Sequence, residues 1–403
     1  MEIYVARQPI FNKNKKIYGY ELLFRGGTTN AFPPIDGDTA TSKLLSNSFF
    51  NIGIEQIVGG KKAFVNFTED LLIKKVPTLF PKDVLVVEVL EDVKPHQEVV
   101  EACKEISQGG YGIALDDFFY TSGWDPLISL ADIIKIDFRA TPVDTIREYV
   151  ENLSSFGVRF LAEKVETHEE FQLASDMGFE YFQGYFFSKP QIVSGKDVSP
   201  SKINLVQLVA EANKPEFQFE ELEKLILRDV SISYKLMRYI NSSFFRRVHE
   251  ISSIKQAIIL LGEVGMRRFI SLIVMAKLAS DKPEELVRTS IIRARLCELL
   301  GRHSGEDING AELFTLGLFS LIDAIMDQEM ESLMNKLPLT ESIKRALIAG
   351  EGTLADFLRI AVSYETGDWQ GFADATRKLG VEEEKVPELY LEALGWADSI
   401  NAI

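Results

Sequence analysis

Short apolar runs of strand length recur along the first half of the chain, and stretches with helical spacing separate most of them. The runs are IYVARQPIFN (3–12), KKIYGYELLFR (15–25), KKAFVNF (61–67), VLVVEVL (84–90), YGIALDD (111–117), DIIKID (132–137), RFLAEKV (159–165) and YFQGYFF (181–187). Helical spacing marks 37–53, 95–108, 142–156 and 168–177. Such repeated alternation indicates βα units around a mainly parallel sheet, and the number of units favours a closed, TIM-like β/α barrel over an open sheet.

The pattern changes after Pro190. Residues 191–201 are polar and contain Ser, Gly and Pro, which is typical of a linker. From Lys202 onward apolar residues recur at three- and four-residue spacing, and no run is typical of a strand. The sequence therefore predicts a barrel domain over 1–190, a linker over 191–201 and an all-α domain over 202–403.

Several apolar runs of the first half end in charged or amide side chains. An ionised side chain in a strand buried on both faces is costly unless a metal or counter-ion compensates it. Catalytic groups of a β/α barrel lie at the C-terminal ends of its strands. Those ends carry Glu21, Asn66, Glu88, Asp116, Asp117, Lys135, Asp137, Glu163 and Gln183.

These side chains offer oxygen donors and one lysine, without His or Cys, so the pattern favours Mg²⁺ or Mn²⁺ over zinc or copper. At the end of a strand, Asp116 could bridge two cations while Asp117 binds only the second. Two cations about 3.5–4 Å apart are the usual device for in-line attack on a phosphodiester. Lys135 would then orient the attacking water or a phosphate oxygen. A structural ion-pair network on the barrel rim is the alternative interpretation of the same residues.

Charge and cysteine content exclude several classes of protein. A formal net charge of −16 argues against a surface dedicated to a nucleic acid polymer. The two cysteines, Cys103 and Cys297, lie far apart in helical patterns, which predicts buried, reduced thiols rather than a disulfide framework or zinc cluster. The start of the chain lacks the pattern of a signal peptide, and no apolar run is long enough for a membrane span. We therefore expect a cytoplasmic protein without membrane insertion.

The first half resembles the EAL domain of cyclic di-GMP phosphodiesterases. The motifs that carry this resemblance are QPI (8–10), ELLFR (21–25), VNF (65–67), EVLE (88–91), DDF (116–118), KID (135–137), AEKVET (162–167) and QGYFFSKP (183–190). The second half resembles the HDOD domain, a helical relative of HD-GYP phosphodiesterases that lacks their metal residues. The whole chain is thus similar to the two-domain EAL–HDOD family.

The resemblance implies metal-dependent hydrolysis of one phosphodiester of cyclic di-GMP, giving the linear dinucleotide pGpG. It assigns the Mg²⁺ or Mn²⁺ ligands to Glu21, Asn66, Glu88, Asp116, Asp117 and Glu163. Glu163 would also take a proton from the attacking water, with Lys135 as the second catalytic residue. Substrate contacts are implied for Gln8, Arg25, Asp137, Glu166 and Gln183. Glu91 would steady the loop after the double Asp.

Two positions depart from the family pattern. The loop after the double Asp reads DDFFYTSGWDPL (116–127) instead of the family's D-D-F-G-T-G-Y-S-S-L, a loop that supports metal binding and dimerisation in active relatives. Lys164 stands where active relatives have Gly, and its cation could compete with a metal or point outward.

These departures leave three functions open. The chain could be an active phosphodiesterase that forms a homodimer through its EAL domain. It could instead be a catalytically impaired cyclic di-GMP receptor or protein scaffold. In the third case the HDOD domain is the output and recruits a protein partner whose identity the sequence does not reveal.

Overall fold

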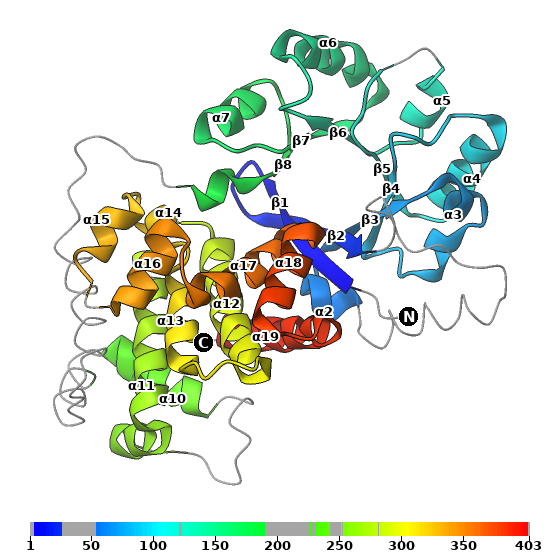
Figure 1. Ribbon diagram of the computed structural model, residues 1–403. Helices are drawn as coiled ribbons and strands as arrows, with labels where there is room; N and C mark the ends of the chain where they lie inside the picture. The colour runs from blue at the N-terminus through cyan, green and yellow to red at the C-terminus, as the bar shows by residue number, and fades with distance from the viewer. Residues whose placement is uncertain are drawn as a thin grey trace. The chain divides into compact units, whose positions relative to one another are not determined.

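The structure is a computed structural model of the 403-residue chain. It describes residues 4–25, 54–120, 123–189, 226, 230–241, 251, 253–280, 282–337 and 339–401. The helix predicted at 37–53 and the linker predicted at 191–201 lie outside the described residues. The chain divides into two compact units, Met1–Phe187 with Glu365–Gly367, and Ser188–Tyr364 with Asp368–Ile403 (Figure 1).

The first unit is a closed barrel whose strands follow one another in sequence order. Its strands are β1 (Tyr4–Asn12), β2 (Ile17–Arg25), β3 (Lys62–Phe67), β4 (Leu85–Val89), β5 (Gly112–Leu115), β6 (Ile133–Asp137), β7 (Arg159–Glu163) and β8 (Tyr181–Gln183). The pairings from β2 to β8 are parallel, whereas β1 runs antiparallel to both β2 and β8. The predicted β/α barrel is confirmed, with one reversed strand at its start.

A tight turn causes this reversal. The side-chain oxygen of Asn12 accepts hydrogen bonds from the backbone N–H groups of Asn14 and Lys16. Lys15 takes a positive φ of 56°, which lets the chain double back after only a few residues. The C-terminal ends of β2 to β8 therefore share one mouth of the barrel, and the N-terminal half of β1 lies at the same mouth.

Short helices cover the outside of the barrel (Figure 1). They are α2 (Ile54–Val58), α3 (Glu69–Ile73), η1 (Val76–Leu79), α4 (Gln97–Gln108), α5 (Asp125–Ile128), α6 (Val143–Leu153), η2 (Ser154–Phe156), α7 (His168–Asp176) and η3 (Tyr185–Ser188). The helix α4 buries Val99, Ala102, Cys103 and Ile106, a spacing that places them on one face. Thr167 and Glu170 form a capping box that fixes the start of α7 just after the site.

The barrel interior is filled by one apolar side chain from most strands. This layer consists of Ile10, Phe64, Val86, Ala114, Ile133, Leu161 and Tyr181. All seven are nearly or completely buried. They form a floor on which the polar residues of the mouth rest.

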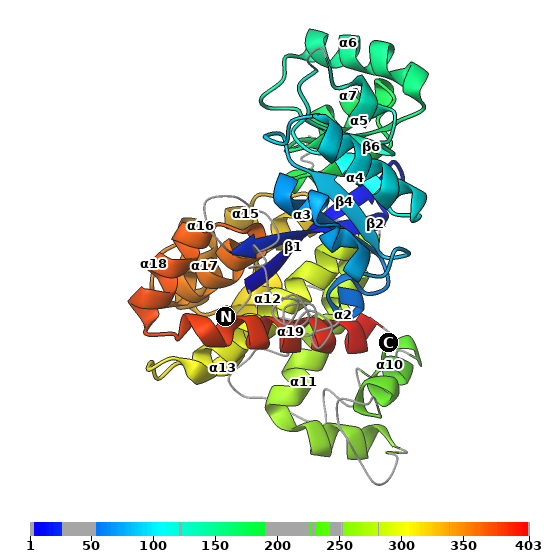
Figure 2. The same ribbon diagram turned by 90° about the vertical axis from the view of Figure 1, so that its right-hand side faces the viewer.

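The second unit is helical, and its described part contains no strand. Its helices are α10 (Val230–Ile240), α11 (Ile254–Leu278), α12 (Glu284–His303), α13 (Gly310–Phe319), α14 (Ile322–Met326), α15 (Met330–Met334), α16 (Glu341–Ala349), α17 (Thr353–Thr366), α18 (Trp369–Leu379), η5 (Glu383–Lys385) and α19 (Val386–Asn401) (Figure 2). α11 is interrupted at Gly262, whose φ of 62° is not helical. None of the described helices combines the length and the apolarity that crossing a membrane requires.

Close helix packing explains a glycine of this unit. A Cβ atom on Gly317 of α13 would lie 2.5 Å from backbone atoms of Arg293 and Ala294 on α12. Only glycine lets the two backbones approach this closely. Cys103 of the barrel and Cys297 of α12 are both buried and free, as predicted.

Candidate active site

Strand geometry places the polar residues of the mouth on the inner face of the barrel. Side chains two residues apart point to the same face of a strand. Each residue of this set follows a core residue by two positions: Asn66, Glu88, Asp116, Lys135, Glu163 and Gln183 follow Phe64, Val86, Ala114, Ile133, Leu161 and Tyr181. β1 runs in the opposite direction, so its mouth residue Gln8 precedes the core residue Ile10 by two.

The strand pairing also sets their height. Gln8 pairs with Glu21, Asn66 with Glu88, and Asp137 with Glu163. The two members of each pair therefore lie next to each other on neighbouring strands at the mouth.

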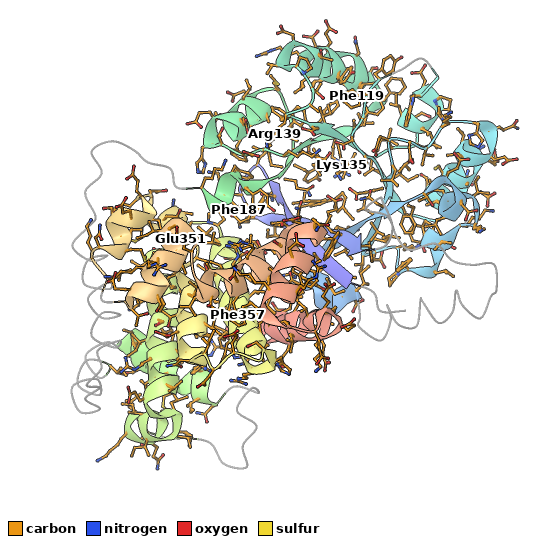
Figure 3. The ribbon with its side chains drawn as sticks, viewed as in Figure 1. Phe119, Lys135, Arg139, Phe187, Glu351 and Phe357 are labelled. Atoms are coloured by element: carbon orange, nitrogen blue, oxygen red, sulfur yellow. The ribbon has the colours of Figure 1, made fainter. Side chains whose placement is uncertain are left out.

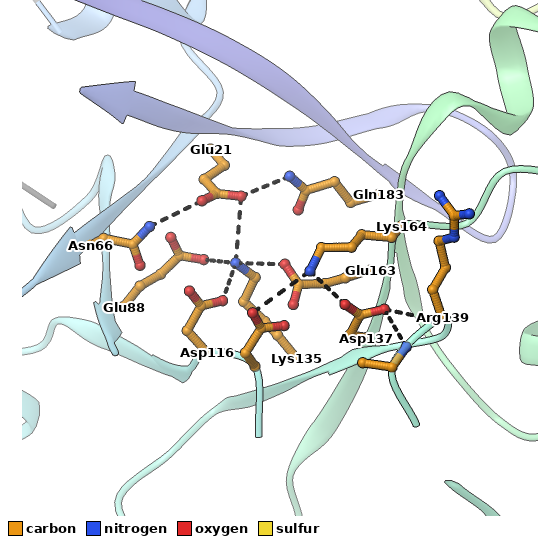
Figure 4. Close-up of polar contacts among 12 residues, drawn as sticks. Glu21, Asn66, Glu88, Asp116, Lys135, Asp137, Arg139, Glu163, Lys164 and Gln183 are labelled. Atoms are coloured by element: carbon orange, nitrogen blue, oxygen red, sulfur yellow. Dashed lines mark hydrogen bonds and ion pairs between the residues drawn. The ribbon is translucent and has the colours of Figure 1, made fainter. Parts of the chain in front are cut away.

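Lys135 lies at the centre of this ring. Lys135 pairs with Leu161 of β7, so its Cα lies two residues deeper in the barrel than that of Glu163. The long Lys135 side chain extends from there toward the mouth. The Nζ atom lies 2.6 Å from Asp116 Oδ1, 2.7 Å from Glu88 Oε1 and 2.9 Å from Glu163 Oε1. Glu21 Oε2 is 3.5 Å away. Figures 3 and 4 show Lys135 inside the barrel with these carboxylates around it.

Amide side chains hold Glu21 in this ring. Asn66 Nδ2 donates to Glu21 Oε1 at 3.0 Å, and Gln183 Nε2 donates to Glu21 Oε2 at 2.7 Å. The same Gln183 nitrogen lies 2.9 Å from Gln8 Oε1. The amides leave both Glu21 oxygens directed into the mouth (Figure 4).

The shared charge shifts the pKa values of the buried groups. Burial opposes the charge of Lys135, but Asp116, Glu163, Glu21 and Glu88 outweigh it and raise the Lys135 pKa well above its usual value. Burial raises the pKa of Glu88 and of Glu163 well above the usual value, and the neighbouring carboxylates add to this effect while Lys135 opposes it. One buried ammonium therefore balances the four carboxylates only in part.

The donor set fits a hard divalent cation. Among the described residues no three His, Cys, Asp or Glu side chains form a ready-made metal site, since the four carboxylates surround an ammonium instead. Apart from the oxygens that contact Lys135, five buried oxygens of the mouth accept no hydrogen bond from the described part of the chain: Asn66 Oδ1, Glu88 Oε2, Asp117 Oδ1, Glu163 Oε2 and Gln183 Oε1. Buried, unsatisfied carboxylate and amide oxygens are the ligands that Mg²⁺ and Mn²⁺ prefer.

A second cation contact lies at the edge of the ring. Lys164 Nζ is 2.5 Å from Asp137 Oδ2 and 3.7 Å from Asp117 Oδ2. Burial alone would raise the pKa of Asp137, but hydrogen bonds from Lys164 and from the backbone N–H groups of Ala140 and Arg139 lower it below the usual value. Of the two orientations that the sequence left open for Lys164, the structure shows the one directed at carboxylates.

Backbone hydrogen bonds fix the start of the altered loop. The Asp116 N–H donates to Val89 O, and the Phe118 N–H donates to Lys135 O. Phe118 is buried and makes edge-on ring contacts with Trp124 and Tyr149. Residues 121–122 of this loop lie outside the described part of the chain.

Similarity to known proteins agrees with these features. The family model of the EAL domain matches residues 35–190, and that of the HDOD domain matches residues 200–346. The cyclic di-GMP phosphodiesterase CdgJ of Vibrio cholerae is 40% identical over 403 residues, covering 99% of this chain and 93% of CdgJ. The chain belongs to the EAL–HDOD family.

A second relative has a similar level of identity to this chain. The uncharacterized protein YuxH of Bacillus subtilis is 38% identical over 408 residues, covering 99% of both chains. The solved structure of Bacillus subtilis YkuI, with an EAL domain in complex with c-di-GMP and calcium, is 18% identical with a TM-score of 0.36. That match covers 65% of this chain and 73% of YkuI, and so low a similarity supports no conclusion about this chain.

The described structure does not place three of the expected site residues of this EAL–HDOD protein in the ring. Arg25 ends β2, but its side chain is outside the described part of the structure. Glu166 forms an ion pair with Arg139, whose side chain is 61% exposed. Glu91 is exposed, and no hydrogen bond or ion pair joins it to another described residue. Their functional roles stay predictions.

Two contacts of the EAL–HDOD site were not anticipated. The direct bond between Gln8 and Gln183 depends on the reversed direction of β1, which the apolar pattern does not reveal. The pairing of Arg139 with Glu166 joins the segments that follow β6 and β7, and Arg139 lies in no apolar run or motif that would have marked it.

Proposed function

We propose that this EAL–HDOD protein hydrolyses one phosphodiester bond of cyclic di-GMP and releases linear pGpG. The observation that carries the proposal is the ring of four carboxylates around Lys135 at the barrel mouth, three of which (Glu21, Glu88 and Glu163) are buried. The 40% identity with a cyclic di-GMP phosphodiesterase over nearly the whole chain supports the same substrate.

The ring provides ligands for Mg²⁺ or Mn²⁺. Glu21, Asn66, Glu88 and Asp116 would hold a first cation, and Asp116, Asp117 and Glu163 a second. Bound cations polarise the phosphodiester and lower the pKa of the attacking water. The specific metal is part of the proposal, and the all-oxygen donor set supports a hard cation.

Glu163 and Lys135 have different proposed roles in the reaction. Glu163 Oε2 is buried, accepts no hydrogen bond from the described residues and belongs to a carboxyl group whose pKa is raised. A free carboxylate oxygen at the mouth suits a group that would take a proton from the attacking water. Lys135 contacts the carboxylates themselves, so we assign it a positioning role: its charge holds the ring together.

A hydrolysis assay tests the proposal. Purified full-length protein is incubated with cyclic di-GMP and Mn²⁺ or Mg²⁺, and pGpG is quantified by chromatography. Glu163→Gln keeps the size of the side chain but removes the base, and we expect a loss of about 10²- to 10⁴-fold in kcat. Glu341→Gln, at an exposed glutamate of α16, is the matched control. Equal rates in wild type and Glu163→Gln would refute the assignment.

A cyclic di-GMP receptor is the second candidate function. The contact of Lys164 with Asp117 favours it, because this ammonium competes for a carboxylate that catalysis would need. Binding of cyclic di-GMP without pGpG formation in the same assay would establish the receptor. A homodimer through the barrel and a protein partner of the helical domain stay predictions, which size-exclusion light scattering and affinity capture would test.

A further inference from the structure

Lys164 has an unusual backbone conformation directly after Glu163. Its φ is +53°, a left-handed value that L-residues with a side chain disfavour. The next residue is pinned by β8 and the segment after it, because the Val165 N–H donates to Gln183 O and the Phe186 N–H donates to Val165 O. This reversal at the end of β7 directs the Lys164 side chain back over the mouth (Figure 4).

The Lys164 ammonium is paired with Asp137, while 53% of the Lys164 side chain is exposed to solvent. Asp137 Oδ2 accepts its hydrogen bond at 2.5 Å. The other oxygen of Asp137 accepts from the backbone N–H groups of Arg139 at 2.7 Å and Ala140 at 3.0 Å. Because backbone donors hold Asp137, the ion pair with Asp137 keeps the positive charge of Lys164 near the edge of the mouth.

That charge lies beside Asp117. The distance from Lys164 Nζ to Asp117 Oδ2 is 3.7 Å, and Asp117 Oδ1 is buried without a hydrogen-bond partner among the described residues. In the proposed function Asp117, like Glu163, is a ligand of the second cation only. A divalent cation at Asp117 would therefore meet both a shared ligand and a repelling positive charge.

We propose that Lys164 is a built-in counter-ion of Asp117 that weakens the binding of a second divalent cation. Among the described residues the ion pairs of Lys164 are with Asp117 and Asp137, and none is with Glu21, Glu88 or Asp116, so we expect a much smaller effect on the first cation position. The two positions would then fill at well-separated cation concentrations. The inference rests on the cation site of the proposed function.

Titration of the full-length protein with Mn²⁺, without nucleotide, tests this inference by electron paramagnetic resonance of the free ion. Lys164→Gln removes the charge and keeps most of the side chain, while Lys164→Gly also relieves the positive φ. We expect both variants to bind the second Mn²⁺ about tenfold or more tightly than wild type, with the first within about twofold. Lys164→Arg keeps the charge and should behave as wild type.

Lys74→Gln provides the matched control. Lys74 pairs with Asp70 on the exposed face of α3, so its removal should change neither Mn²⁺ affinity. Thermal denaturation measures whether each variant is folded. If Lys164→Gly does not fold, the Mn²⁺ affinities of Lys164→Gln alone test the inference. An unchanged second affinity in Lys164→Gln, or no Mn²⁺ binding by any form, would overturn the inference.

Hydrolysis of cyclic di-GMP by the same preparations separates this inference from the proposed function. A tighter second site in Lys164→Gln without turnover would uphold the role of Lys164 and refute the phosphodiesterase activity. Turnover with identical Mn²⁺ affinities in wild type and Lys164→Gln would support the phosphodiesterase activity and refute the role of Lys164.

Discussion

The Nζ atom of Lys135 lies 2.7 Å from Oε1 of Glu88, and both side chains are completely inaccessible to solvent. Such a pair is poor evidence for stability, because the desolvation of two charges offsets much of their attraction. Asp116 and Glu163 crowd the same ammonium, which leaves excess negative charge at the mouth. This excess is what a divalent cation would neutralise.

Removal of Lys135 should strongly destabilise the barrel. Lys135→Met leaves Glu88, Asp116 and Glu163 buried without their ammonium, so we expect a loss of about 3–5 kcal/mol in the free energy of unfolding. Urea denaturation measures it, and added Mn²⁺ should restore part of the loss. The exposed Lys74→Met should change stability by less than about 0.5 kcal/mol. A loss in Lys135→Met no larger than that would show that the ring needs no counter-ion.

Cation binding should strengthen as pH rises. The pKa values of Glu88 and Glu163 are raised by burial, so both groups retain protons that a cation must displace. In the window between the unfolded and the folded pKa values the folded protein binds more protons than the unfolded chain. Without a cation, its free energy of unfolding should therefore fall as pH rises through that window.

Mn²⁺ titrations and urea denaturation over one pH series measure these two effects together. Mn²⁺ affinity that does not change with pH, or stability that rises through the window, would contradict the raised pKa values. Glu88→Gln carries no titrating proton at that position and should show a weaker pH dependence of stability than wild type.

Gly19 should be intolerant of a side chain. It lies two residues before Glu21 on β2, and a Cβ atom there would lie 2.7 Å from Lys62 O. Because backbone must move, Gly19→Ala should lower the free energy of unfolding by about 1–3 kcal/mol and shift Glu21. Gly112→Ala on β5 is the matched control, since its Cβ would have 3.6 Å to the nearest atom. Equal stability of the two variants, measured by urea denaturation, would disprove the packing argument.

Both cysteines should resist alkylation in the folded protein. Burial raises the pKa of Cys103 to about 11 and that of Cys297 to about 12. Few thiolates are then present at neutral pH, and reagents cannot reach them. Iodoacetamide labelling followed by mass spectrometry should show slow modification that becomes fast in urea. Rapid labelling of Cys297 under native conditions would mean that α12 opens locally.

The inner face of the barrel was predictable because a period of two is a strict geometric rule. Ala114 and Asp116, or Leu161 and Glu163, must share a face in any straight strand. The direction of β1 was not predictable from apolar spacing, which is the same for parallel and antiparallel strands. Its reversal depends on the local turn chemistry of Asn12 and Lys15.

Charge contacts were the least predictable part of the site. The sequence placed Lys135 near the carboxylates, but its position two residues deeper than Glu163 follows from the β6–β7 register. The direction of Lys164 depends on a single positive φ, which no residue pattern marks. The exposure of Glu91 and the pairing of Glu166 with Arg139 also depend on the geometry of loops, which the residue pattern does not determine.

The most direct test of the central claim is the rate of pGpG formation from cyclic di-GMP as a function of Mn²⁺ concentration, in wild type and in Glu88→Gln. Glu88 is completely buried and belongs to the ring alone, and the substitution preserves its shape. We expect a Mn²⁺-dependent rate in wild type and a loss of about a hundredfold or more in Glu88→Gln at the same Mn²⁺ concentration. A wild-type rate that does not depend on Mn²⁺, or a Glu88→Gln variant as active as wild type, would contradict the assignment of the ring as a catalytic cation site.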